Sequence, residues 1–427
     1  MLGLHTDLYQ LTMAAGFFQS GKAADIGTFE LFVRRFPRNR DILIAAGLPQ
    51  AIDYLLNLSF TSEEIEYLRA LPPFRHAVPE FFDYLARFRF TGDLFAMAEG
   101  TPFFPGEPII RVRAPLIEAQ IPETYLLSIV SFQTLIATKA VRVVEAAAGR
   151  PVIEFGTRRA HSPEAGVLAA RASYIGGCIG TSNVEAGLRY GIPTYGTSAH
   201  SWVMAFEREE QAFRELHRLL GEGTTYLVDT YDTIAATRAA AALGRPMWGV
   251  RLDSGDMAAL SREVRQVLDA AGLRDAKIMV SGDLNENRIR DMLAHAACVD
   301  AFGVGTELAT SSDAPNLSAV YKMVEIESAG VTRSTAKFSA EKATLPGAKQ
   351  VFRYPDHDRM GTSGEAADGG VPLLEPVILN GRAVKTLPAA AAARDYCATE
   401  LRRVRPGRRI EYSERLNGLA NRLRTQP

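Results

Sequence analysis

The 427-residue chain has little of what metal, disulfide and polyanion chemistry require. It contains three cysteines and seven histidines, and its formal net charge is -1. The cysteines lie far apart, at positions 178, 298 and 397. Their spacing excludes a disulfide framework and a zinc-binding pattern, and it fits a reducing cytosol. The small net charge provides no overall field for polyanions, so anionic ligands must be bound by local arginines, lysines and backbone N–H groups.

Targeting and membrane signals are also lacking. The first residues show no basic segment followed by an apolar run, so we expect no signal peptide. We find no run of roughly 18 apolar residues and expect no membrane span. There is no basic stripe or known nucleic-acid motif. These observations predict a cytoplasmic protein with neither membrane nor nucleic-acid partners.

The first part of the chain, to about residue 115, mixes the two kinds of secondary structure. Apolar periodicity predicts helices over residues 7–19, 45–58 and 62–71. Alternation predicts a strand over 27–36, and residues 93–112 are predicted to form strands broken by Gly and Pro. A long, alanine-rich helix is predicted over residues 123–149.

Short apolar runs then recur, each ending in a polar or glycine-rich turn. The runs cover residues 151–156, 176–181, 192–197, 225–229, 247–253, 277–283, 300–306 and 318–325. Helices predicted over 207–220, 233–242, 257–271 and 285–295 separate several of them. About eight runs alternating with helices predict a (β/α) barrel, irregular because some intervals are too short for a helix. A doubly wound open sheet stays the alternative, because periodicity does not separate the two.

Regular patterning fades after residue 340. Residues 340–353 are lysine-rich, as in a loop that grips ATP or pyrophosphate, although a solvated loop has the same composition. Residues 355–371 are polar and glycine-rich and predict a mobile loop. An alanine run at 389–393 predicts the start of a terminal helix that continues to residue 403.

Residues suited to chemistry follow the apolar runs, where barrel active sites are built. They occupy segments 154–159, 229–232, 251–256, 281–283 and 303–306. Each segment alone is typical of an ordinary turn, helix cap or surface pair. The last two are glycine-rich turns in succession, and such turns expose the backbone N–H groups that bind phosphate in barrels. We therefore predict a phosphate site there.

His200 lies in a segment of small and hydroxyl residues, 196–202, where solutes can approach its ring. Such a histidine can act as acid, base or nucleophile, although a loop histidine is more often simply hydrogen-bonded. Together with anion-binding turns, arginines and carboxylates, it suggests a phosphorylated sugar substrate and phosphoryl or glycosyl transfer. Carboxylates beside phosphates imply Mg²⁺ or hydrogen bonds to sugar hydroxyls.

Taken in order, these segments resemble nicotinate phosphoribosyltransferases over most of the chain. The matching segments are 6–13, 29–34, 154–160, 180–184, 196–201, 251–256 and 303–306, followed by Lys337, Lys342, 344–347 and 349–351. Each is weak alone, but the ordered set is highly specific.

The resemblance implies the α/β fold of type II phosphoribosyltransferases, an irregular (β/α) barrel plus a mixed α+β domain from both chain ends. Residues 1–120 and 331–427 would form the mixed domain, and 121–330 the barrel. The implied reaction makes nicotinate mononucleotide and pyrophosphate from nicotinate and phosphoribosyl pyrophosphate. ATP hydrolysis would be coupled through transient phosphorylation of His200, with Mg²⁺ held mainly by substrate phosphates. The family also implies a homodimer, in which Tyr9 of one protomer and Phe155 of the other enclose the pyridine ring.

The residue types agree with these roles. Aromatic faces suit the flat pyridine ring. Its carboxylate would be bound by Arg158, Arg159, Ser182 and Asn183. The 5′-phosphate would be bound by Gly303, Gly305 and Thr306, with Ser281 and Gly282 nearby. The ring nitrogen is itself the nucleophile and needs no general base, so His200 is better suited to accept a phosphoryl group.

The carboxylates have two possible partners. Asp253, with Arg251 beside it, would bind ribose hydroxyls or the magnesium pyrophosphate. Asp229 or Asp253 would stabilise the positive charge that builds on the sugar as its anomeric C–O bond breaks.

Two other functions stay open. A nicotinamide phosphoribosyltransferase would share the fold, although adjacent Arg158 and Arg159 favour the acid over the amide. A catalytically silent barrel could bind phosphorylated metabolites as a sensor, although the presence of His200 and Asp253 argues against it.

Overall fold

The computed structural model describes residues 2–244, 246–338 and 343–425, and the chain divides into two compact units. The first, here called the mixed unit, comprises Met1–Leu135, Asn316–Pro388 and Tyr396–Pro427. The second, the barrel unit, comprises Ile136–Pro315 and Ala389–Asp395. The chain thus leaves the mixed unit at residue 135 and returns to it at 316, whereas the sequence-based edges were 120 and 330.

A seven-stranded antiparallel sheet forms the centre of the mixed unit. Its strands, in spatial order, are β13 (Val331–Ser334), β12 (Ala319–Ser328), β1 (Ile26–Val33), β5 (Pro108–Pro115), β3 (Asp93–Ala96), β17 (Glu375–Leu379) and β18 (Arg382–Ala383). Residues 27–33 of β1 are all buried, which suits a strand paired on both edges. A two-stranded ladder, β2 (Leu43–Ile44) with β4 (Pro102–Phe103), accompanies it.

The helices of the mixed unit come from both ends of the chain. They include α1 (Leu8–Gln19), α2 (Leu48–Asn57), α3 (Ser62–Ala70), α4 (Pro79–Ala86), α5 (Leu116–Gln120) and α16 (Glu414–Thr425). Two further helices, α6 (Glu123–Ala146) and α15 (Ala390–Arg403), belong partly to each unit. The helices expected at 7–19, 45–58, 62–71, 123–149 and 389–403 are thereby confirmed, with ends shifted by up to three residues.

The prediction of a mobile loop over residues 355–371 is wrong. A second sheet of the mixed unit contains β16 (Val371–Pro372), β14 (Lys349–Arg353), β15 (His357–Thr362) and β19 (Arg409–Tyr412). In β15 an inward position is occupied by Asp358, which is fully buried and paired with Arg353. A buried ion pair replaces the apolar residue that alternation would reveal, so the pattern hides the strand.

In its described residues, the barrel unit is built on six parallel strands and not on the expected eight. In spatial order they are β7 (Gly180–Thr181), β6 (Val152–Glu154), β11 (Ala301–Val304), β10 (Lys277–Val280), β9 (Gly249–Leu252) and β8 (Thr225–Leu227). Of the other expected runs, 192–197 makes only an isolated bridge from Thr194 to Thr181, and 318–325 becomes β12 of the mixed unit.

The order of the six strands is cyclic. Successive strands are neighbours, and β11 returns to pair with β6, so in the described chain the ring is open only between β7 and β8. A doubly wound sheet would place its first strand beside its middle ones. The irregular barrel is therefore confirmed, and the doubly wound alternative is excluded.

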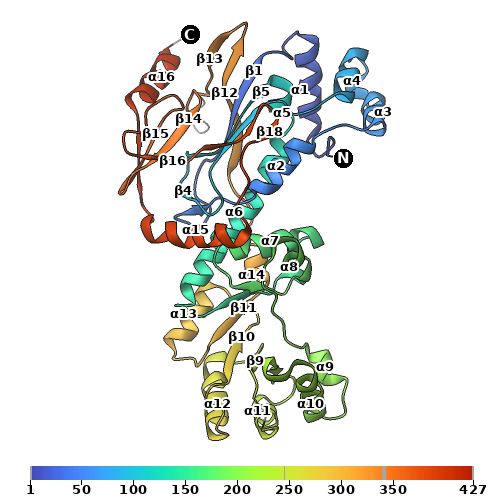
Figure 1. Cartoon of the computed structure of the whole chain (residues 1–427), viewed down its shortest axis with the longest axis vertical. Coiled ribbons are helices and arrows are strands. Elements are labelled where there is room, and N and C mark those ends of the chain that lie inside the picture. Colours follow the sequence, from blue (N-terminus) through green and yellow to red (C-terminus); the bar gives the residue numbers. More distant parts are fainter. Residues whose placement is uncertain (1, 245, 339–342, 426–427) are drawn as a thin grey trace. The chain divides into compact units, whose positions relative to one another are not determined.

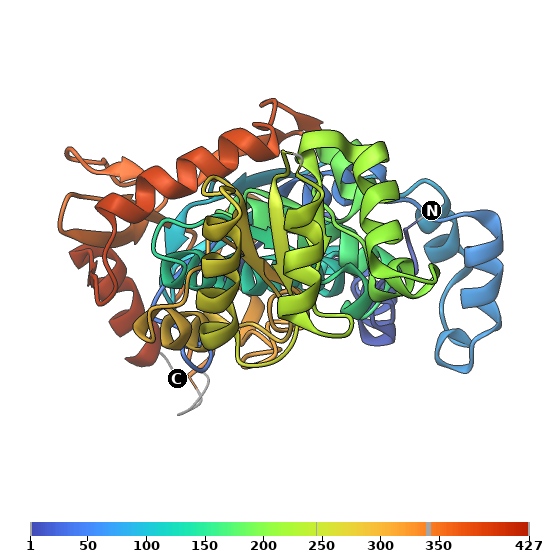
Figure 2. The same cartoon turned by 90° about the horizontal axis from the view of Figure 1, so that it is seen from below.

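Helices connect and cover these strands. They are α7 (Pro163–Ile175), α8 (Val184–Tyr190), α9 (His200–Met204), α10 (Glu209–Leu220), α11 (Thr233–Ala242), α12 (Met257–Ala270), α13 (Glu286–Ala294) and α14 (Thr306–Ala309). Figures 1 and 2 show α10, α11 and α12 side by side, and each contacts the next. Their apolar faces enclose buried strand residues that include Val250, Ile278 and Phe302.

One helical stretch corrects the expectation of no membrane-length apolar run. By length and composition alone, Leu116–Ala146 is apolar enough to cross a membrane. Of its most apolar window, 56% is buried inside the chain. The core helix of a globular protein passes the same test, so this stretch is weak evidence for a membrane.

A buried carboxyl of the mixed unit predicts a pH-dependent stability. Burial and the charge of Asp358 raise the pKa of Glu107 to about 8. Between the ordinary carboxyl pKa and about 8, Glu107 is protonated when folded and ionised when unfolded, so stability falls as pH rises. Glu107→Gln mimics the protonated form and does not titrate. The melting temperature of this variant minus that of the wild type should therefore increase as the pH rises from about 5 to about 8. Melting curves across this range check it; a difference independent of pH would contradict it.

Candidate active site

The carboxyl ends of the barrel strands form one edge because their register is level. Leu252 of β9 pairs with Val280 of β10, and Val304 of β11 pairs with Glu154 of β6. A cavity of about 1160 Å³ opens at this edge. Of the site residues expected from sequence, it is lined by Phe155, Arg158, Arg159, Ser182, His200, Arg251, Asp253, Ser281, Gly282, Gly303, Gly305 and Thr306. Asp229 and Asn183 do not line it, and Tyr9 belongs to the mixed unit.

Arg251 and Asp253 form the most strongly connected part of the cavity wall. Arg251 Nη2 lies 2.8 Å from Asp253 Oδ1, and Arg251 also donates to Ser281 Oγ and Thr197 Oγ1. The Ser281 hydroxyl donates to the same Asp253 oxygen. Burial opposes ionisation of Asp253, but the bonds from Arg251 and Ser281 prevail and lower its pKa. The carboxylate is therefore held charged and oriented.

Asp229 lies behind this pair. Its Oδ2 accepts hydrogen bonds from the backbone N–H of Asp253, at 2.9 Å, and from Ser254 Oγ, at 2.7 Å. Its Oδ1 is buried and has no hydrogen-bond partner among the described residues. Asp229 thus fixes the turn that presents Asp253, and it keeps one uncommitted carboxylate oxygen.

His200 is the first residue of α9 and is half-buried. Its Nδ1 lies 3.2 Å from Thr230 Oγ1, so the other ring nitrogen, Nε2, is not used in this contact. The positive charge that His200 can carry also helps to lower the pKa of Asp253. Histidine and carboxylate therefore belong to one electrostatic site.

The turns after β6 and β7 are tied together beneath Phe155. The buried carboxylate of Glu154 accepts hydrogen bonds from Thr181 Oγ1 and from the backbone N–H of Gly156. Burial raises the pKa of Glu154, and these two bonds counteract the rise. Residues Arg158, Arg159 and Ser182 follow on these turns and line the cavity.

The Asn183 side chain helps to join these two turns and does not line the cavity. Its Oδ1 accepts the backbone N–H of Ala186 and caps α8, and its Nδ2 donates to Thr157 Oγ1 at 3.2 Å. The side chain is thus already used in holding the turn after β7 against the turn after β6.

The glycines of the last two turns have separate roles. Gly282 has φ +88°, and a Cβ there would lie 2.1 Å from the Asp253 carbonyl oxygen. A Cβ on Gly303 would lie 2.5 Å from the Phe155 ring, whereas one on Gly305 would meet nothing closer than 3.4 Å. Gly303 was expected to bind phosphate, but its missing side chain makes room for the aromatic ring.

This geometry predicts the effect of Gly303→Ala. The added methyl group must displace the Phe155 ring, so the KM for the ring-bearing substrate should rise about tenfold, with that for the sugar phosphate changed much less. Steady-state kinetics with each substrate varied measures the two effects. Gly305→Ala is the comparison variant: a methyl group there meets no part of the Phe155 ring, so any rise in KM should fall on the sugar phosphate and not on the ring-bearing substrate. In Gly303→Ala, a larger rise in the KM for the sugar phosphate than in that for the ring-bearing substrate would indicate that Gly303 binds phosphate after all.

Sequence reasoning missed the outer end of the cavity. Arg262 of α12, Arg288 of α13 and His295, the residue after α13, line it. Their positions in or next to helices gave no signal, because a cation on an exposed helix face is ordinary. Among the described residues, no group of three His, Cys, Asp or Glu is arranged to hold a metal ion by itself.

The remaining expected residues belong to the mixed unit. Tyr9 is 49% exposed on α1, and Lys337 is exposed. Lys349 does not lie in a solvated loop, because it is buried in β14 with its Nζ 2.7 Å from Glu30 Oε2. Lys342 lies outside the described residues.

Comparisons with known proteins agree on one family. The family model described as the nicotinate phosphoribosyltransferase N-terminal domain matches residues 4–131, and that of the nicotinate phosphoribosyltransferase family matches 151–344. A nicotinate phosphoribosyltransferase of Mycobacterium tuberculosis is 42% identical, covering 99% of this chain and 94% of that relative. One of Bacillus subtilis is 45% identical, covering 85% and 75%. The crystal structure of human nicotinic acid phosphoribosyltransferase is 28% identical with a TM-score of 0.85, covering 98% and 100%.

Proposed function

This chain belongs to the nicotinate phosphoribosyltransferase family, and from that premise we propose that it makes nicotinate mononucleotide for NAD biosynthesis. Its substrates are nicotinate and phosphoribosyl pyrophosphate, and pyrophosphate is the second product. The observation that carries the proposal is the cavity, in which Phe155 and two arginines precede a carboxylate–arginine pair and two glycine-rich turns. These features suit a pyridine carboxylate, a ribose and a phosphate.

In the reaction, the nicotinate nitrogen forms a bond to the anomeric carbon while the bond from that carbon to the pyrophosphate oxygen breaks. The electron pair leaves with pyrophosphate, and positive charge develops on the sugar. Asp253, held ionised by Arg251 and Ser281, can bind the ribose hydroxyls and stabilise this charge. Asp229 supports it through the Asp253 backbone N–H. No proton has to be removed from nicotinate, so no general base is needed.

Mg²⁺ fits this site as a companion of the pyrophosphate. Three carboxylate ligands do not gather at any one place in the described chain, so substrate phosphates would supply most of the ligands. Asp253, which lines the cavity, is the protein carboxylate suited to help hold it, whereas the free oxygen of Asp229 is buried away from the cavity. The ion would neutralise the leaving group, while the residues of the chain orient the sugar.

We further propose that ATP hydrolysis is coupled to the reaction through phosphorylation of His200. Attack by Nε2 on the terminal phosphorus of ATP would form an N–P bond, break the bond to the bridging oxygen and release ADP. Water later cleaves the N–P bond and releases phosphate. The contact from Nδ1 to Thr230 supports this proposal, because it orients the ring and leaves Nε2 for the phosphoryl group.

Selectivity for the acid over the amide tests the proposed substrate. Arg158 and Arg159 line the ring end of the cavity, and a site built for a carboxylate leaves its cations unpaired when the amide binds. We expect nicotinate to be used with a kcat/KM at least about 100-fold above that of nicotinamide. Parallel assays at equal concentration measure the ratio, and a preference for the amide would overturn the substrate assignment.

The proposed assembly is a homodimer with shared sites. On α1, Leu8, Tyr9 and Met13 are exposed at 48%, 49% and 39%. On α8, Val184 and Leu188 are 77% and 81% exposed, one turn apart. A second copy of the chain would cover such apolar faces and could bring its Tyr9 to the ring end of the cavity.

Complementation tests the shared site. If Tyr9 and Phe155 act from different protomers, mixing inactive Tyr9→Ala and Phe155→Ala chains produces heterodimers in which one site keeps both aromatics. We expect the mixture to recover about one quarter of wild-type activity after subunit exchange, from the statistics of two-chain assembly. Activity is measured on the mixture and on each parent alone. A mixture as inactive as its parents would contradict the shared site.

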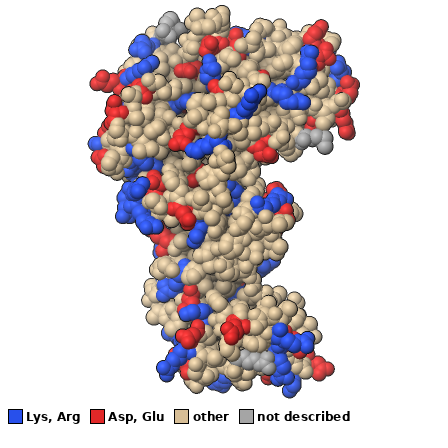
Figure 3. All heavy atoms as spheres, viewed as in Figure 1, with Lys and Arg blue, Asp and Glu red and all other residues tan. Residues whose placement is uncertain are grey.

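The other expected properties stand as proposals of the same kind. On the face drawn in Figure 3, basic and acidic side chains intermingle, which supports the absence of nucleic-acid partners. All three cysteines are free, which suits a cytoplasmic location. A sensor that binds the sugar phosphate without turnover is the remaining alternative, and it predicts binding with no product.

A further inference from the structure

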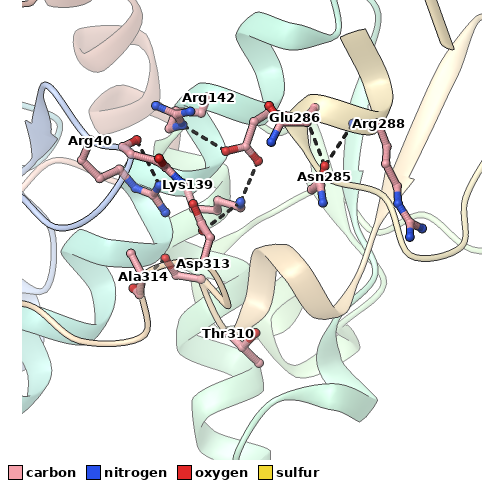
Figure 4. Close-up of polar contacts among 12 residues, drawn as sticks. Arg40, Lys139, Arg142, Asn285, Glu286, Arg288, Thr310, Asp313 and Ala314 are labelled. Carbon is pink, nitrogen blue, oxygen red and sulfur yellow. Dashed lines mark hydrogen bonds and ion pairs between the residues drawn. The ribbon is translucent and has the colours of Figure 1, made fainter. Parts of the chain in front are cut away.

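A buried cluster of charges lies outside the cavity in the barrel unit (Figure 4). Lys139 of α6 is 1% exposed, and its Nζ lies 2.6 Å from Glu286 Oε2 and 2.9 Å from Asp313 Oδ1. Arg142, one turn further along α6, donates from Nε to Glu286 Oε1 at 3.0 Å. The cluster thus brings two cations and two carboxylates together, and none of the four residues lines the cavity.

The two carboxylates belong to segments that follow the two anion-binding turns. Glu286 lies in the first turn of α13, directly after the turn at residues 281–284. Asp313 follows α14, which begins at the turn containing Gly305 and Thr306. A single ammonium group is thus bonded to both segments. The strands before them, β10 and β11, are paired, so Lys139 adds a side-chain link beyond the point where that pairing ends.

The cluster has a direct connection to the cavity wall. Arg288 lies in the same first turn of α13 as Glu286 and lines the cavity, and its Nη1 donates to the Asp283 carbonyl oxygen at 2.9 Å. The side chain of Asn285 caps this turn through the backbone N–H groups of Asn287 and Arg288 (Figure 4). A shift of Glu286 would therefore move Arg288 and the turn before it.

Stability alone does not explain the cluster. Burial opposes ionisation of Glu286, but Lys139 and Arg142 lower its pKa, so it stays charged inside the protein. Burying charges is costly, and well-packed apolar residues are often at least as stabilising in such places. What an ion cluster provides is a fixed geometry between the segments it joins.

We propose that Lys139 is a positioning residue, which holds the two anion-binding turns at the separation that the phosphoribosyl substrate requires. The inference rests on the proposed function, since it assigns the turns to that substrate. Without the ammonium group, the segments of Glu286 and Asp313 lose their common partner, and the buried Glu286 and partly buried Asp313 carboxylates repel each other. Binding of the sugar phosphate should weaken, whereas the ring end, carried by the turns after β6 and β7, should be unaffected.

The test is Lys139→Met in the full chain, assayed with Mg²⁺ while phosphoribosyl pyrophosphate and nicotinate are varied in turn. We expect the KM for phosphoribosyl pyrophosphate to rise about tenfold, with the KM for nicotinate within about twofold of wild type. Lys139→Arg keeps the charge and should recover part of the loss. Asp358→Asn, which breaks a buried ion pair of the mixed unit, is the matched control and should lower the melting temperature without changing either KM.

Three results would contradict the positioning role of Lys139. A Lys139→Met protein with a lower melting temperature and an unchanged KM for phosphoribosyl pyrophosphate would make the cluster merely structural, as would equal rises in both KM values. If this variant does not fold, Asp313→Ala removes one of the two acceptors, and an unchanged KM there would equally overturn the proposal. Wild-type turnover in the same assay reports separately on the proposed function.

Discussion

Replacing Asp253 with alanine should lower kcat/KM for phosphoribosyl pyrophosphate by about a thousandfold, or about 4 kcal/mol of transition-state stabilisation. The carboxylate accepts from Arg251 and Ser281 and is held ionised, and in the proposed reaction it stabilises the reacting sugar. Its loss removes the negative charge opposite the developing cation and leaves Arg251 without its ionic partner, although its hydrogen bonds to Ser281 and Thr197 remain. Initial rates at low substrate concentration measure the effect.

Asp253→Asn separates charge from shape. The amide oxygen can still accept from Arg251, but the negative charge is gone, so we expect most of the loss to persist. Because the pKa of Asp253 is lowered, the stability it contributes is present above the ordinary carboxyl pKa and disappears only as pH falls through the lowered value. Activity above about half of wild type in Asp253→Asn would show that the charge of Asp253 is not used in catalysis.

The second large effect is expected for His200→Ala. If His200 carries the phosphoryl group, the ratio of rates with and without ATP should fall to about one, and ADP release linked to product should cease. The uncoupled reaction should continue at its slow rate, because the nicotinate nitrogen attacks the sugar without help from the imidazole. Simultaneous measurement of nicotinate mononucleotide and ADP gives both quantities.

His161→Ala is the control for this experiment. His161 is exposed, follows the two arginines and does not line the cavity, so its removal should leave the ATP effect intact. Undiminished ATP-coupled turnover in His200→Ala would remove His200 from the mechanism.

Much of the cavity could be predicted because its residues follow strands. In a barrel, all strand carboxyl ends meet at one edge, so residues such as Phe155, Asp253 and Ser281 come together although they are distant in sequence. The cyclic order of the strands was harder to predict from the sequence. Strands of two to four residues give little periodicity, and the run at 192–197 has the composition of a strand but makes a single bridge.

Contacts that depend on tertiary structure could not be predicted. Gly303 looks like part of a phosphate turn, and only the position of the Phe155 ring reveals that it makes room for an aromatic side chain. Lys139 lies in an apolar, alanine-rich helix where a lysine suggests a solvated face, and both of its partners are more than 140 residues away. Lys349 looks like part of a basic loop until its buried partner Glu30 is seen.

The most direct test is one assay of the purified protein with Mg²⁺, phosphoribosyl pyrophosphate and nicotinate, with and without ATP. We expect nicotinate mononucleotide to form, to form faster with ATP, and to be accompanied by ADP. Product with nicotinamide or another base, and none with nicotinate, would keep the fold and contradict the substrate. No product with any base would contradict the proposed enzyme and favour a phosphometabolite-binding barrel.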